Sequence, residues 1–95
     1  MSTQSSPIAR FKLGRITTTP TALSWLTCED ILMAIRRHQA GDWGDVSEGD
    51  RETNERALLD GTRLWSVYRS AAGPRFWVIT EADRSATTVL LPEEY

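Results

Sequence analysis

The chain has 95 residues, of which 40% are hydrophobic and 25% charged, and a formal net charge of −2. This length and composition suit one globular domain and exclude a second domain and global disorder. Cys28 is the only cysteine, which excludes an intramolecular disulfide and a thiolate-rich zinc site. No stretch approaches the roughly 18 apolar residues of a membrane span, and Met1 to Ser6 lacks the basic and apolar regions of a signal peptide.

The N-terminal part of the chain predicts a flexible end and a strand. Residues 1–7 are rich in Ser and Thr, and we expect them to be flexible, whereas residues 8–95 form a single domain. Residues 8–17 alternate in polarity, which predicts a strand with Phe11 and Leu13 on one face.

Two helices follow this strand. Thr19 before Pro20 supplies an N-cap and a first-turn proline, which predict a helix of one or two turns. Thr27 with Asp30 approximates a capping box, and Gly41 is a natural end for the second helix. Apolar residues at helical spacing predict a buried stripe along this second helix: Cys28, Ile31, Leu32 and Ile35.

A third helix is predicted from Ser47, which caps it together with Asp50, to about Asp60, with Gly61 as its terminator. This helix has few apolar residues. We therefore expect its acidic side to face solvent.

The last third of the chain changes from helical to alternating periodicity. Strands are predicted at residues 64–68, 76–80 and 87–91, with tight turns between them, which together make an antiparallel meander. The fold class is therefore α+β. We expect an antiparallel sheet of about four strands, formed by the N-terminal strand and the meander, with two or three helices on one face.

The middle of the chain is acidic and supplies the candidate partner-binding residues. Trp43 lies in a turn with glycines on both sides, so it is either a plug under the loop or an anchor that binds a partner. The carboxylates do not have the spacing of a calcium-binding loop, and we predict no metal site. The candidate partner-binding set is Trp43, Asp42, Asp45, Glu48, Glu52 and Glu55.

His38 is the only histidine and supports an alternative, catalytic interpretation. As a general base it would serve a small metal-independent ribonuclease or toxin, in which the scissile phosphate is bound by Arg84, Thr80, Thr87 and Tyr95. The simpler interpretation is that His38 stabilises the end of its helix, because no second acid or base accompanies it.

A nucleic-acid-binding module is a further alternative. Trp65 and Trp77 lie on predicted strands, where exposed aromatic rings would stack on bases, although core packing explains them more simply. Arg10, Lys12 and Arg15 are the basic residues for this interpretation, but the net charge of −2 disfavours binding to a phosphate backbone.

Two segments of the sequence, from Arg37 to Asp45 and from Trp77 to Pro92, carry a family resemblance. The chain resembles short proteins of plasmids, phages and integrative elements, which are sometimes labelled as a type I restriction subunit M. That label implies a methyltransferase, whose motifs the sequence lacks. The family has no settled activity, so the resemblance implies a context, the antagonism of host defence, rather than a mechanism.

The leading prediction combines the acidic segment with this context. We expect a cytoplasmic, non-catalytic interaction protein of a mobile genetic element, which acts as an anti-CRISPR or anti-restriction inhibitor through its acidic surface. Its partner would be a protein, such as a host defence nuclease complex. We expect no cofactor, no membrane contact and no direct nucleic-acid binding, and the sequence does not predict the oligomeric state.

Overall fold

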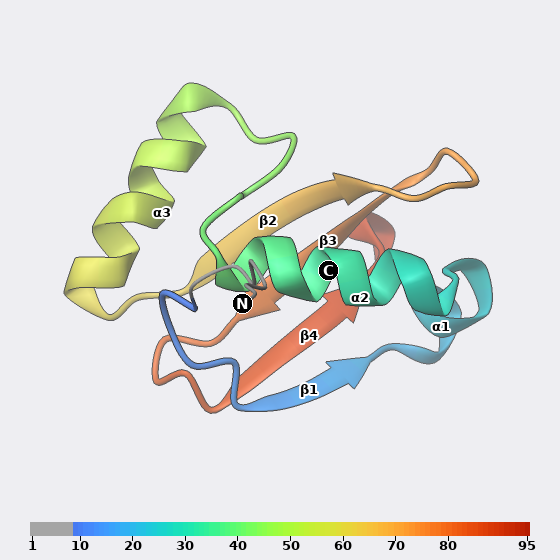
Figure 1. Cartoon of the computed structure of the whole chain (residues 1–95), viewed down its shortest axis with the longest axis horizontal. Helices are drawn as coiled ribbons and strands as arrows, with labels where there is room; N and C mark the ends of the chain where they lie inside the picture. Colours follow the sequence, from blue (N-terminus) through green and yellow to red (C-terminus); the bar gives the residue numbers. More distant parts are fainter. Residues whose placement is uncertain (1–8) are drawn as a thin grey trace, which may run out of the picture.

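The computed structural model describes residues 9–95, and the flexible segment predicted for residues 1–7 lies outside the described residues. Figure 1 shows the elements in chain order: β1 (Arg15–Thr18), α1 (Pro20–Trp25), α2 (Cys28–Gln39), α3 (Glu48–Asp60), β2 (Leu64–Arg69), β3 (Arg75–Thr80), β4 (Ala86–Leu90) and a final 3-10 helix η1 (Pro92–Glu94). The predicted α+β class is confirmed. The three long helices and the three C-terminal strands also fall within a few residues of their predicted positions.

The four strands form one sheet in the order β1-β4-β3-β2. β2, β3 and β4 are the predicted antiparallel meander. β1 pairs in parallel with β4, with Arg15 opposite Ala86 and Thr18 opposite Val89. The sheet is therefore mixed, although it is mostly antiparallel.

The predicted strand at residues 8–17 is wrong in its first half. Gly14 has a φ of +66°, and a Cβ built there would lie 2.3 Å from the backbone of Ser85, so the chain turns at this glycine before the strand begins. The segment before the turn crosses to α2 instead, where the Arg10 amide donates to the Gln39 carbonyl at 2.8 Å. Phe11 and Leu13 still pack against the two core clusters, as their spacing predicted.

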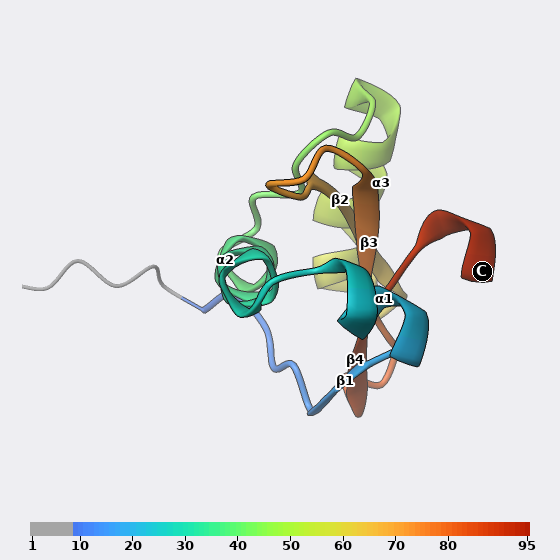
Figure 2. The same ribbon diagram turned by 90° about the vertical axis from the view of Figure 1, so that its right-hand side faces the viewer.

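One face of the sheet, which we call the inner face, carries the main core. Figure 2 shows the sheet edge-on, with α2 on one side and η1 on the other. Two helices, α1 and α2, pack on the inner face, and each begins at a polar cap. Thr19 caps α1, and the predicted capping box of Thr27 and Asp30 begins α2. The buried residues of this cluster are Ala22, Leu26, Ala34, Ile35, Tyr68, Phe76, Val78, Val89 and Leu91.

The predicted buried stripe of α2 is half correct, since Ile35 is buried and Ile31 packs against the main core. Cys28 is exposed and Leu32 is 59% exposed, whereas Ala34, Ile35 and His38 are buried. The other half of the prediction failed because it selected large apolar residues, while the position nearest the sheet requires the small Ala34, and a hydrogen-bonded histidine fills the next turn.

The exposed edge of β2 is covered by side-chain and loop contacts. The Asn54 side chain of α3 donates to the Trp65 carbonyl at 2.7 Å and accepts from the Trp65 amide at 3.0 Å. Two residues further along, the Val67 amide donates to the Trp43 carbonyl at 3.0 Å. These bonds satisfy backbone groups that an edge strand otherwise leaves open, and they hold α3 beside the sheet.

Candidate functional site

His38 is fully buried between α2 and the inner face of the sheet. Its Nδ1 lies 2.6 Å from Ser66 Oγ on β2, and its Nε2 lies 2.8 Å from Thr80 Oγ1 on β3. The rings of Phe11 and Trp43 meet its imidazole edge to face, with centroid distances of 5.1 and 5.7 Å. The helix, the sheet and the N-terminal segment thus converge on one polar group.

The hydrogen bonds around His38 form a chain in which the donor of each bond can be assigned. Thr87 Oγ1 donates to the Leu13 carbonyl at 2.7 Å, so Thr80 Oγ1, 2.7 Å from Thr87 Oγ1, must donate to it. Nε2 then donates to Thr80, and Nδ1 accepts from Ser66. The chain of donors places a proton on Nε2, and a neutral imidazole then accepts from Ser66 at Nδ1.

Burial fits this neutral state, since desolvation lowers the pKa of His38 to about 3, and the positive charge of Arg84 acts in the same direction. A histidine with no exposed surface contacts no substrate in this conformation. The structure therefore contradicts the general-base role of His38. The simpler interpretation was right that the residue is structural, but His38 bonds to the sheet rather than to a helix carbonyl.

Thr80, Thr87 and Arg84 of the catalytic alternative lie around His38, but in structural roles, whereas Tyr95 lies apart beside Trp77. Thr80 and Thr87 are fully buried in the same hydrogen-bond chain. Arg84 has a φ of +61° and donates to backbone carbonyls, including those of Thr62 at 2.7 Å and Ala57 at 3.0 Å. Its guanidinium is therefore occupied in closing the turn between β3 and β4 against the end of α3.

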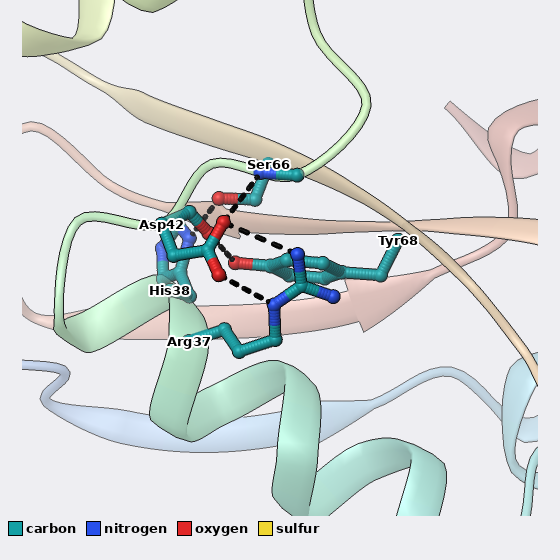
Figure 3. A network of polar contacts seen from close by, with 6 residues as sticks. Arg37, His38, Asp42, Ser66 and Tyr68 are labelled. Carbon is teal, nitrogen blue, oxygen red and sulfur yellow. Dashed lines mark hydrogen bonds and ion pairs between the residues drawn. The ribbon is translucent and has the colours of Figure 1, made fainter. Parts of the chain in front are cut away.

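The turn after α2 is held by a second polar network, drawn in Figure 3. Arg37 donates to both carboxylate oxygens of Asp42, at 2.7 and 3.1 Å, and this hydrogen bonding holds the pKa of Asp42 below its usual range. The Tyr68 hydroxyl donates to the Asp42 carbonyl at 2.5 Å, and burial raises the pKa of Tyr68. Gly44 follows with a φ of +78° and so little space that a Cβ would lie 2.0 Å from the Val67 carbonyl oxygen.

Trp43 is the plug under this loop and not an exposed anchor, since only 2% of its surface is accessible. Its indole stacks on Phe11, with ring centroids 6.1 Å apart, and its Nε1 donates to Glu55 at 2.9 Å. Of the two alternatives that the sequence left open, the structure has the buried one. The assignment of Trp43 to a partner-binding surface is corrected accordingly.

Four of the five predicted partner-binding carboxylates are paired with arginines of the same chain. The pairs are Asp42 with Arg37, Asp45 with Arg75, Glu48 with Arg51, and Glu55 with Arg10. Glu52 is exposed on α3 and belongs to none of these pairs. Among residues 9–95, no three His, Cys, Asp or Glu side chains group as metal ligands. The acidic surface is thus largely neutralised locally.

The opposite face of the sheet, which we call the outer face, carries a cluster of aromatic side chains. Trp65 and Trp77 meet edge to face with centroids 5.2 Å apart, and Tyr95 lies 5.5 Å from Trp77. Arg63 places its guanidinium 5.2 Å from the centre of the Tyr95 ring. Together with Ile79 these residues line a hollow of about 240 Å³.

The outer face leaves this cluster partly in solvent. Trp65 and Trp77 are half-buried, and Tyr95 is 63% exposed. Trp65 Nε1 is enclosed, yet it has no hydrogen-bond partner among the described residues. Core packing, the simpler explanation of these tryptophans, is therefore wrong, because they lie outside both core clusters.

The charges around the outer face are mixed. Strand alternation places Arg15, Arg69 and Arg75 on the same side as the tryptophans. Glu93 lies on η1, which crosses this side of the sheet, and shares a second small hollow with Arg75. The charged groups named around the aromatic cluster are therefore mostly positive, with Glu93 as the acidic exception.

The sequence indicated part of this site. Alternation in the strands placed Trp65 and Trp77 on one face, but it did not tell which face the helices cover. Tyr95 and Arg63 lie outside the strands and gave no periodic signal.

No helix among the described residues is long and apolar enough to cross a membrane. None of the protein-family models, curated proteins or solved structures compared with this chain matches it.

Proposed function

We propose that this protein is a non-catalytic interaction protein that docks on a protein partner through the outer face of its sheet. The observation that carries the proposal is the half-exposed cluster of Trp65, Trp77 and Tyr95, on the face without a layer of long helices. Tryptophan, tyrosine and arginine are the residue types that dominate the binding energy of protein interfaces. A hollow between such side chains is suited to an apolar anchor residue of the partner.

The charges beside the cluster are mostly positive, but the net charge of the whole chain is −2, which disfavours a nucleic acid as the partner. Arg15, Arg63 and Arg69 belong to none of the ion pairs among the described residues. Glu93 is exposed close by, and Arg75 is shared with Asp45 at 3.4 Å. Arginine is enriched in protein interfaces, so exposed guanidinium groups beside an aromatic cluster fit a protein partner.

The outer face replaces the acidic surface as the proposed docking site. A carboxylate that already pairs with its own arginine attracts a basic partner less strongly, and exposed pairs of this kind contribute little. Four of the five candidate carboxylates are in that state. The mobile-element context and the defence complex as partner come from the sequence resemblance alone, and they remain part of the proposal.

The test is affinity purification from the host cell followed by titration of the purified partner. We expect Trp77→Ala to weaken binding by about thirtyfold or more, since central tryptophans of interfaces contribute at least about 2 kcal/mol. The α3 variant Glu52→Gln is the matched control and should bind like the wild type. Circular dichroism and urea denaturation show whether each variant is folded.

Two outcomes would contradict the proposal. Equal partner affinity of Trp77→Ala and the wild type would place the docking site elsewhere. Salt-dependent binding of a labelled single-stranded oligonucleotide, lost in Trp77→Ala, would show instead that the cluster stacks on bases.

A further inference from the structure

The solvent side of α2 carries a short apolar stripe between two opposite charges. Leu32 and Met33 are 59% and 58% exposed, and Glu29 and Arg36 are exposed one turn before and after them. These four side chains line one shallow hollow on the surface of the helix. At 100° per residue they fall within one stripe about 100° wide, which is the width of a helix-packing face.

The two charges of this stripe have no partner within the described part of the chain. None of the four ion pairs there includes Glu29 or Arg36, although two neighbouring residues, Asp30 and Arg37, are both engaged. Leu32 and Met33 belong to neither core cluster. The stripe is therefore an amphipathic face on which nothing packs within residues 9–95.

The order of these residues makes the stripe complementary to itself. Glu29 and Arg36 lie seven residues apart, with Leu32 and Met33 at the midpoint. When two such helices pack antiparallel about a two-fold axis at the midpoint, Glu29 of each copy lies opposite Arg36 of the other. Both apolar pairs then meet at the centre, where ridges of one helix fill grooves of the other.

We propose that two copies of this chain associate through α2, with Leu32 and Met33 at a two-fold axis and reciprocal pairs between Glu29 and Arg36. The contact involves one stripe on one helix, so the dimer is weak and reversible. Figure 2 places this side of α2 and the outer face of the sheet on opposite sides of the molecule. Dimerisation through α2 therefore leaves both outer faces open.

Charge reversal with rescue tests the reciprocal pairs. Glu29→Arg or Arg36→Glu alone replaces two attractive contacts of the dimer by two repulsive ones, and we expect either to raise the dimer dissociation constant about tenfold or more. The double variant Glu29→Arg with Arg36→Glu restores both attractions and should recover wild-type association. Glu52→Arg makes the same charge change on α3 and should leave association unchanged. Sedimentation equilibrium up to about 1 mM protein measures all four.

Cysteine cross-linking tests the position of the axis. In a Cys28→Ser background, Met33→Cys brings two thiols together across the axis and should form a disulfide-linked dimer under mild oxidation. The native Cys28 should not, because the two copies of residue 28 lie about 14 Å apart along the helices. A wild-type protein that stays monomeric at 1 mM, a double variant without rescue, or cross-linking at Cys28 in place of residue 33 would each overturn the proposal.

Discussion

The inner and outer faces of the sheet both carry polar and aromatic side chains, but these side chains differ in hydrogen bonding and in exposure. On the inner face, every polar atom of the His38, Thr80 and Thr87 side chains has a partner. On the outer face, the Trp65 indole nitrogen has none among the described residues, and the neighbouring rings are partly exposed. The bonds of the inner face are complete within the fold, whereas the unpaired indole nitrogen and the partly exposed rings of the outer face are not explained by packing within the described chain.

The first prediction tests the largest expected difference between the two faces. His38→Ala removes a buried ring and leaves Ser66 and Thr80 with unmatched hydrogen bonds, so we expect a loss of about 3 to 5 kcal/mol in the free energy of unfolding. Trp77→Ala on the outer face should cost less than half of that, since its ring is already partly in solvent. Urea denaturation at pH 7 measures both, and equal losses would contradict the contrast.

Thr80→Val sharpens the same contrast without creating a cavity. The substitution keeps the shape of the side chain but removes the hydroxyl between His38 and Thr87, both of which are buried. We expect a loss of about 1 to 3 kcal/mol for the groups left unsatisfied. Thr88→Val, at a half-buried position next along β4, should change stability by less than about 1 kcal/mol.

The pH dependence of stability follows from the low pKa of His38. The folded state binds a proton only near pH 3, while the unfolded chain binds one near pH 6.5. Between these values the unfolded state binds more protons, so stability is complete above pH 6.5 and falls as the pH decreases, at about 1.4 kcal/mol per pH unit. His38→Gln should remove this slope between pH 4.5 and 6.5; an unchanged slope would show that other groups cause it.

Trp43→Phe tests the plug interpretation of the loop. The variant keeps an aromatic ring beside Phe11 but loses the bond from Nε1 to Glu55, so we expect a loss of about 1 to 2 kcal/mol. Glu55→Gln is the companion variant, because its side chain still accepts from the indole while the charge pairing with Arg10 is lost. A Trp43→Phe variant as stable as the wild type would show that this bond contributes nothing.

The smallest effect is expected on α3. Glu52 and Asp60 are exposed and belong to none of the described ion pairs, so Glu52→Gln and Asp60→Asn should change the free energy of unfolding by less than about 0.5 kcal/mol. They should also leave partner binding unchanged if the outer face is the docking site. Weaker binding of these variants would restore the acidic helix as the interface.

Local signals in the sequence were sufficient for most of the fold. Thr19, Thr27 and Ser47 cap the helices that they were predicted to cap, because capping depends only on residues a few positions apart. The parallel partner of β1 and the turn at Gly14 were missed, since both depend on β4, about seventy residues away.

The candidate sites were harder to predict than the fold. Polarity indicated that His38 and Trp43 are important, but polarity alone does not tell whether a group is buried with partners or exposed without them. The spacing of Cys28, Ile31, Leu32 and Ile35 gave the correct helix and half of its buried face. The other half was missed because a small alanine and a bonded histidine pack against the sheet better than a leucine. Two of the arginines that neutralise the acidic segment, Arg10 and Arg75, are at least thirty residues from their carboxylates, so no local pattern indicated these pairs.

The pairing of the first strand with the last one constrains how the chain folds during synthesis. Thr17 of β1 faces Thr88 of β4, so the sheet cannot be completed until nearly the whole chain has left the ribosome. The β2–β3 hairpin and the α2 helix rely on near neighbours and form earlier, whereas closing the longest loop comes last. Until then the Leu13 carbonyl is missing from its place beside Thr87, and the nascent chain exposes the surface that β1 later covers.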